Sequence, residues 1–158
     1  MTGLVAKIIE RAATLNKTVV LPEGEDKRVV KAASEVAKAG FAKVVLLGNE
    51  EKIKADNPEI SLDGVTVLDP VTNEKTDSYA QLLFTVRQGK INKKTGLSEY
   101  AAVEDAKAAI LKDYATYGAC MLKAGDVDGM VSGACHSTAN TLRPGLQIVK
   151  TAPGLPLV

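Results

Sequence analysis

The segment VSGACHSTANTLRP, residues 131–144, holds the densest set of chemically useful side chains in this sequence. It follows an apolar run and opens a helical pattern. We therefore expect its backbone N–H groups to attract an anion through the free donors and the dipole of a helix start. Ser132, Ser137 and Thr138 would add hydroxyl donors, and Arg143 would add a bidentate clamp for phosphate.

The same segment also has an ordinary structural interpretation. Gly133 is then a turn residue, Ser137 or Thr138 is an N-cap, and His136 is a structural hydrogen-bonding residue. No nucleophile and acid are defined beside His136, so a catalytic triad has little support. We expect Cys135 to be a small buried residue rather than a nucleophile. The motifs GxxxxGK[ST] and GxGxxG are absent, which argues against a P-loop or a dinucleotide fingerprint.

A second charged loop, residues 22–28, follows another apolar run. Arg28 could reach a phosphate from this loop. We nevertheless interpret Glu23, Asp26 and Arg28 as the solvated start of a helix, because charged residues at exposed helix ends are common and contribute little.

A local basic cluster begins at Arg87 and continues with Lys90, Lys93 and Lys94. It suits a phosphorylated ligand such as a nucleotide or a coenzyme. Cations at the end of a helix are equally expected from capping alone. One histidine and two cysteines are too few for a convincing zinc centre, although carboxylates could still hold Mg²⁺. We assign no residue as a metal ligand.

The elements that position these residues alternate along the whole chain. Helical patterns cover residues 4–15, 26–40, 49–55, 79–89, 98–111, 112–124 and 137–150, and apolar strand patterns cover 18–21, 42–47, 65–68 and 126–131. Continuous apolar strands between amphipathic helices predict an α/β fold with a doubly wound, mainly parallel sheet. Ligands bind at the carboxyl ends of such strands, which directs attention to residues 22–26 and 132–138.

Composition excludes several classes of function. The chain has 158 residues, with 20 Lys and Arg against 19 Asp and Glu, so a strong basic field for nucleic acid is absent. Hydrophobic residues make up 46%, which is typical of a folded protein. We see neither an apolar run of roughly 20 residues nor the apolar core of a signal peptide. Cys120 and Cys135 form no CxxC pair and suit a reducing compartment, so we expect a cytoplasmic protein. From the balanced charge and the short apolar runs, we expect no nucleic-acid and no membrane partner.

Three blocks carry a resemblance to a known family: LPEGEDKR at 21–28, DVDGMVSG at 126–133, and STANTLRPGLQI at 137–148. Together they resemble phosphate acetyltransferase, of the phosphate acetyl/butyryl transferases, over essentially the whole chain. The resemblance implies interconversion of acetyl-CoA and phosphate with acetyl phosphate and CoA. It also implies a fold like that of isocitrate and isopropylmalate dehydrogenases, with two α/β domains flanking a cleft, and a homodimer.

The resemblance also implies roles for single residues. Coenzyme A would be a substrate, with no bound cofactor and no metal. The phosphate and acyl end of the cleft would be lined by Ser132, Gly133, Ser137 and Thr138. CoA and phosphate would be surrounded by Arg143 and Arg87. Further candidates are Arg28 and His136.

The resemblance further implies that the chain is an N-terminal portion. We expect residues 1–145 to be part of a first α/β domain and residues 146–158 to begin a second one that is cut off, with a new strand from Gly154. The family's general-base aspartate belongs to its C-terminal half, so we expect this chain alone to be inactive. Alternatives are a non-catalytic phosphate- or CoA-binding module and a phosphate butyryltransferase. A malic enzyme C-terminal domain is disfavoured, because Met1 leads straight into the opening helix.

Overall fold

The protein, seen in a computed structural model, is described over residues 3–92, 95–152 and 154–155. Met1 and the last residues of the strand expected after Gly154 lie outside this part of the chain. Four parallel strands form a sheet in the order β3-β2-β1-β4, with bounds β1 Thr18–Leu21, β2 Lys43–Leu47, β3 Val65–Leu68 and β4 Gly129–Met130. Val20 pairs with Val45 on one side and with Met130 on the other. The predicted parallel α/β sheet is confirmed, although its fourth strand is shorter than the predicted 126–131.

The helices match most of the predicted ranges: α1 Gly3–Leu15, α2 Lys27–Ala39, α3 Glu50–Asp56, α4 Thr76–Arg87, α5 Val103–Lys112, α6 Tyr114–Ala124 and α7 Thr138–Pro144. Asp26 caps α2, and Gly40 ends it in the left-handed conformation. The α5 helix begins later than residue 98, because an antiparallel bridge between Ile91 and Ser98 keeps that segment extended. A π-helical turn, η1 Gly145–Val149, continues α7.

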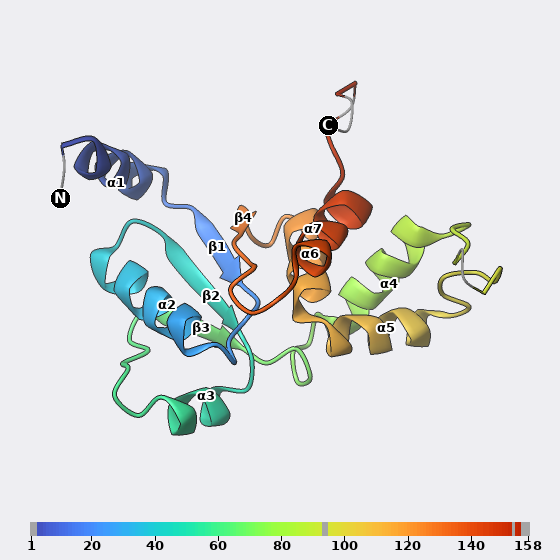
Figure 1. Cartoon of the computed structure of the whole chain (residues 1–158), viewed down its shortest axis with the longest axis horizontal. Coiled ribbons are helices and arrows are strands. Elements are labelled where there is room, and N and C mark those ends of the chain that lie inside the picture. The colour runs from blue at the N-terminus through green and yellow to red at the C-terminus, as the bar shows by residue number, and fades with distance from the viewer. Residues whose placement is uncertain (1–2, 93–94, 153, 156–158) are drawn as a thin grey trace.

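Helices cover both faces of the sheet, as a doubly wound fold requires (Figure 1). Consecutive residues of β2 point to opposite faces: Leu46 belongs to the buried cluster with α2, whereas Leu47 belongs to the cluster with α4, α5 and α6. Both side chains are fully buried. None of the helices in the described part of the chain combines the length and the apolar character needed to cross a bilayer.

The opening helix α1 is confirmed, but its apolar stripe is not buried. Leu4 is 71% exposed and Ile8 is 58% exposed, and none of the residues of α1 is buried. Figure 1 shows α1 projecting from the sheet before β1. The helical pattern in the sequence therefore predicted the helix correctly. It did not predict that the apolar side chains of this helix are exposed.

Asp126 fastens the segment before β4 to the start of α4. It accepts hydrogen bonds from the Lys75 ammonium at 2.5 Å and from the Tyr79 hydroxyl at 2.8 Å. These two donors, Lys75 more than Tyr79, lower the pKa of Asp126 below its ordinary value of 3.8. The ring of Tyr79 also packs edge-on against Tyr117, with centroids 5.1 Å apart. The contact therefore joins the turn before β4 to the aromatic core.

We predict that Asp126→Asn lowers the free energy of unfolding by about 1 kcal/mol at pH 7, because a partly exposed ionic contact is lost. The folded-state pKa is depressed, so this contribution is present above about pH 4 and disappears as the pH falls through the folded-state value. Urea unfolding from pH 7 down to pH 2 checks the difference. Asp56→Asn, at an exposed position on α3, is the control. A difference between wild type and Asp126→Asn that stays constant down to pH 2 would contradict the assignment.

Candidate functional site

The loops after β1 and β4 meet at the carboxyl edge of the sheet. The β1 loop can lie this close to β2 because Gly24 has no side chain: a Cβ there would stand 2.2 Å from the carbonyl oxygen of Leu47. In the β4 loop, Gly133 has φ of +112°, a conformation that favours glycine. Both predicted loops therefore meet at one place. Gly24 permits the close contact of the β1 loop with β2, and Gly133 permits the backbone turn of the β4 loop.

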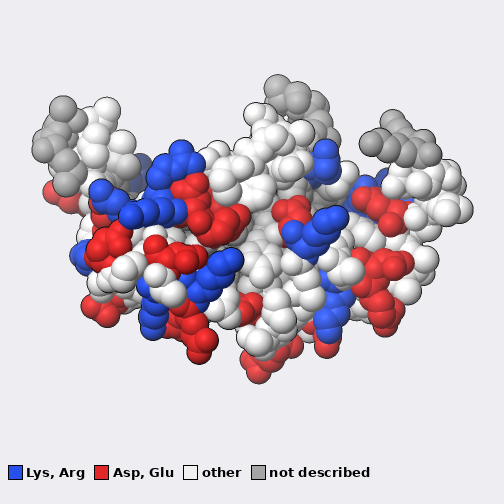
Figure 2. All heavy atoms as spheres, turned by 60° about the horizontal axis from the view of Figure 1, so that its bottom comes forward, with Lys and Arg blue, Asp and Glu red and all other residues white. Residues whose placement is uncertain are grey.

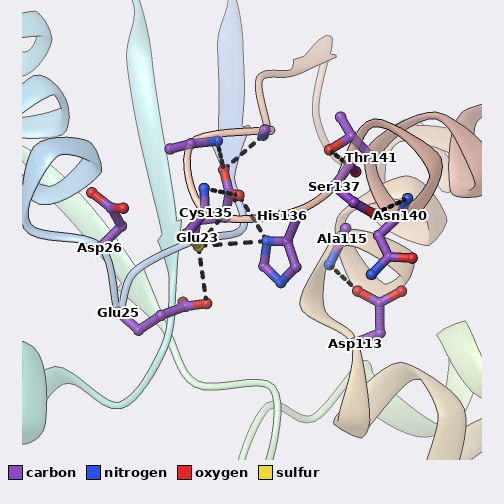
Figure 3. A network of polar contacts seen from close by, with 12 residues as sticks. Glu23, Glu25, Asp26, Asp113, Ala115, Cys135, His136, Ser137, Asn140 and Thr141 are labelled. Carbon is purple, nitrogen blue, oxygen red and sulfur yellow. Dashed lines mark hydrogen bonds and ion pairs between the residues drawn. The ribbon is translucent and has the colours of Figure 1, made fainter.

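The side chain of Glu23 joins the two loops (Figure 3). Its Oε2 accepts hydrogen bonds from the backbone N–H groups of Gly133 at 2.8 Å and Ala134 at 2.9 Å. Its Oε1 accepts from the N–H of Cys135 at 3.0 Å. Glu23 is only 1% exposed, so our interpretation of it as part of a solvated helix start is wrong. We predicted that the N–H groups of this loop attract an anion. In the structure, the anion that they bind is the carboxylate of Glu23.

The electrostatics of Glu23 follow from these contacts. Burial alone would raise its pKa, but hydrogen bonds from Cys135, Ala134, His136 and Gly133 outweigh burial. They lower the pKa of Glu23 from 4.5 to about 2. The carboxylate is therefore ionised at neutral pH, and its charge lies on the N–H dipoles of the loop.

His136 and Cys135 also contact this carboxylate. The Nδ1 atom of His136 lies 2.7 Å from Oε1 of Glu23, and this hydrogen bond raises the pKa of the imidazole. The structural hydrogen-bonding role considered for His136 is thus present. The thiol of Cys135 lies near Glu23 and Glu25, and partial burial together with these carboxylates raises its pKa to about 12. Cys135 is exposed, so the predicted buried position is wrong, while a resting thiolate nucleophile stays unsupported.

A groove of about 440 Å³ lies beside this junction, between the α5–α6 turn and α7. Residues that line it include Glu99, Lys112, Asp113, His136, Asn140 and Arg143. Its acids have partners: Glu99 pairs with Arg87, and Asp113 caps α6 by accepting from the N–H of Ala115. Among the described residues, Lys112 and Arg143 have no such partners. The groove therefore offers uncompensated positive charge.

The candidate residues separate into neighbouring places. His136 and Arg143 line the groove, and Arg87 lies next to it, with its Nε 2.9 Å from Glu99. Ser132 and Arg28 line a second hollow of about 280 Å³ on the other side of the β4 loop. A guanidinium nitrogen of Arg28 donates to the carbonyl oxygen of Ala134 at 2.6 Å, so Arg28 also supports that loop.

The remaining candidates lie in the β4 loop and at the start of α7. The hydroxyl of Ser137 caps α7 by accepting from the N–H of Asn140 at 3.3 Å, which is the ordinary structural role considered for it. Thr138 is exposed on the first turn. The hydroxyl of Ser132 is buried and has no hydrogen-bond partner among the described residues.

Residue patterns missed several members of the site, among them Glu23, Glu99, Lys112, Asp113 and Asn140. Asn140 was detectable, because it lies one helical turn before Arg143 and so shares its face of α7. Lys112 and Asp113 reach the groove only through the packing of α5 and α6 against α7. Elsewhere the charges are mixed in sign: on the face shown in Figure 2, acidic and basic side chains lie next to one another.

A parallel, doubly wound sheet with a groove beside its carboxyl edge has the architecture of α/β domains that bind ligands at that edge. Comparison with known proteins identifies it more closely. The family described as phosphate acetyl/butaryl transferase matches residues 4–158, and the chain belongs to this family. The resemblance inferred from the three sequence blocks is confirmed.

Individual relatives agree with the family. The chain is 51% identical over 152 residues to a phosphate acetyltransferase of Acetivibrio thermocellus, covering 96% of this chain and 43% of the relative. It is 42% identical to one from Thermoanaerobacterium thermosaccharolyticum, covering 99% and 44%. A crystal structure of a phosphotransacetylase from Streptococcus pyogenes matches with a TM-score of 0.84 and 34% identity, covering 99% and 45%. The chain thus spans less than half the length of these relatives.

We predict that Glu23→Gln lowers the free energy of unfolding by about 2–3 kcal/mol. The glutamine amide carries N–H donors where the carboxylate accepts, so at least one backbone N–H of the loop loses its partner and the buried side chain faces an N–H group instead. Urea denaturation at pH 7 measures the change. Glu25→Gln, at the exposed neighbouring position, should change stability by less than about 0.5 kcal/mol. Equal effects of the two substitutions would show that Glu23 does not hold the loops together.

Proposed function

We propose that this chain is the N-terminal part of a phosphate acetyltransferase, which interconverts acetyl-CoA and phosphate with acetyl phosphate and CoA. The groove carries the proposal from the structural side. It places Arg143 and Lys112 together as uncompensated cations, while the neighbouring acids are held by other groups. Both substrates of such an enzyme are anions, and this charge arrangement suits them. The curated relatives described above are named for the acetyl and not the butyryl reaction.

Within this proposal, the groove binds the phosphate-bearing end of a substrate. Asn140 and Arg143 lie one helical turn apart on α7, so both can contact one ligand. His136, held by Glu23, adds an imidazole whose raised pKa favours the charged form. Arg87 acts indirectly: its guanidinium donates a hydrogen bond to Glu99, which lines the groove, and so compensates the charge of that carboxylate. These residues bind and orient substrate, whereas Ser132, Gly133, Ser137 and Thr138 shape the loop and helix start beside it.

The proposed reaction needs a general base that we expect to lie beyond this chain. The CoA thiol has an ordinary pKa of about 8.5, so a base is needed to make the thiolate that attacks acetyl phosphate. Direct attack needs neither a metal nor a covalent enzyme intermediate. The homodimer and the cytoplasmic location stay predictions, as does the division of the chain at residue 145.

A non-catalytic phosphate- or CoA-binding module is the second candidate. It shares the groove and differs only in lacking turnover in the complete protein. The uncompensated cations favour anion binding under either proposal, so a binding measurement tests the groove and an assay of the complete protein separates the two functions.

We predict that Arg143→Ala weakens the binding of CoA or phosphate by about tenfold or more, because a charge-assisted hydrogen bond contributes about 1.5–3 kcal/mol. Isothermal titration calorimetry of the 158-residue chain measures both ligands. Lys123→Ala, at an exposed position near the end of α6, is the control and should leave the affinities unchanged. Unchanged affinity in Arg143→Ala would remove Arg143 from the site.

We also predict that the 158-residue chain alone makes no acetyl-CoA from acetyl phosphate and CoA at an enzymatic rate. The family's general base lies, by resemblance, in the C-terminal half. Chromatography that separates CoA from acetyl-CoA at successive times measures the turnover. Turnover well above the uncatalysed rate would contradict the expected place of the base.

A further inference from the structure

Glu23, Cys135 and His136 bring three kinds of metal-ligating atom to one point, although Glu23 is far from the other two in sequence. Within the described residues, one oxygen, one sulfur and one nitrogen all lie within 4.8 Å of one another. The Sγ atom of Cys135 is 3.5 Å from Oε1 of Glu23 and 3.6 Å from Nδ1 of His136. We propose that these three side chains form a binding site for Zn²⁺ at the edge of the proposed anion groove, with His136 common to both.

The distances fit the coordination shell of zinc. A tetrahedral site with Zn–S of about 2.3 Å and Zn–N and Zn–O of about 2.0–2.2 Å separates its ligand atoms by roughly 3.3–3.6 Å. Both sulfur distances already match. Only the distance from Oε1 of Glu23 to Nδ1 of His136, 2.7 Å, must increase. The side chain of His136 is 30% exposed and lines the groove, so we expect the imidazole to turn enough to increase this distance.

The surroundings of Glu23 suit a ligating carboxylate. Ligating groups are normally held in place by hydrogen bonds from a second layer of residues. Here the N–H groups of Gly133, Ala134 and Cys135 hold the carboxylate from behind, and all three bonds survive when zinc replaces the protons shared with the thiol and the imidazole. The carboxylate of Glu25 is 3.6 Å from Sγ but lies outside this group of mutually close atoms, so a water molecule would complete the shell.

The donor set selects the cation. A thiolate and an imidazole favour zinc and similar transition metals, whereas Mg²⁺ and Ca²⁺ prefer shells of oxygen ligands. Bound zinc would add a second connection between the end of β1 and the β4 loop. The count of cysteines and histidines had argued against such a site, because it did not include a carboxylate from the other loop.

The test is a competition titration of Zn²⁺ into the untagged 158-residue chain with a chromogenic chelator. We expect one zinc ion per chain, and at least about tenfold weaker binding in Cys135→Ser and in His136→Gln. Cys120→Ala removes the other cysteine and should bind like the wild type. Millimolar Mg²⁺ should not displace the zinc. Circular dichroism confirms folding, which the exposed position of Cys135 should preserve.

Co²⁺ gives an independent readout, because a cobalt–thiolate bond produces a near-ultraviolet charge-transfer band and tetrahedral cobalt absorbs strongly in the visible range. Both signals should appear in the wild type and in Cys120→Ala, and both should be lost in Cys135→Ser. The proposal is overturned if wild type and Cys135→Ser bind zinc equally, if Mg²⁺ displaces zinc, or if cobalt shows no thiolate band. Failure of the zinc site would leave the proposed anion groove standing, because Arg143→Ala tests the groove and Cys135, unlike His136, does not line it.

Discussion

The buried carboxylate of Glu23 is the constraint on which the geometry of the site depends. Without contact between the two loops, the β4 loop would leave three backbone N–H groups without partners. The β1 loop would leave the carboxylate of Glu23 without partners. Their union satisfies both needs, because three consecutive N–H groups of residues 133–135 donate to one side chain. The position of His136, and through the loop the start of α7, follows from this contact.

Charge in the neighbouring groove is arranged in the same way. Acidic side chains are held by partners within the fold: Glu99 forms an ion pair with Arg87, whereas Glu23 and Asp113 accept backbone N–H groups of the β4 loop and of the start of α6. The cations Lys112 and Arg143 remain available. A chain with a net charge of only +1 can therefore present two cations without ion-pair partners in one groove, and the proposed binding of anions depends on this arrangement rather than on composition.

The sequence predicted the elements well, because strand and helix patterns depend on local spacing: β1 and α2 lie where the apolar run at 18–21 and the Asp26 cap place them. It also directed attention to both loops. It could not predict that Glu23 is buried, since that depends on a loop more than 100 residues away, and a charged loop residue is normally solvated. Cys135 was misplaced for the same reason. Likewise, the exposure of Leu4 and Ile8 on α1 has no local signature.

Amide hydrogen exchange at residues 133–135, followed by NMR, tests the central role of Glu23 most directly. The three residues are exposed, so exchange near the rate of an unstructured loop would be expected without the carboxylate. If Glu23 accepts all three bonds, the amide protons of Gly133, Ala134 and Cys135 will exchange slowly and with similar protection, as one unit. Exchange of all three at the unprotected rate, in a chain whose β1 amides stay protected, would contradict the account.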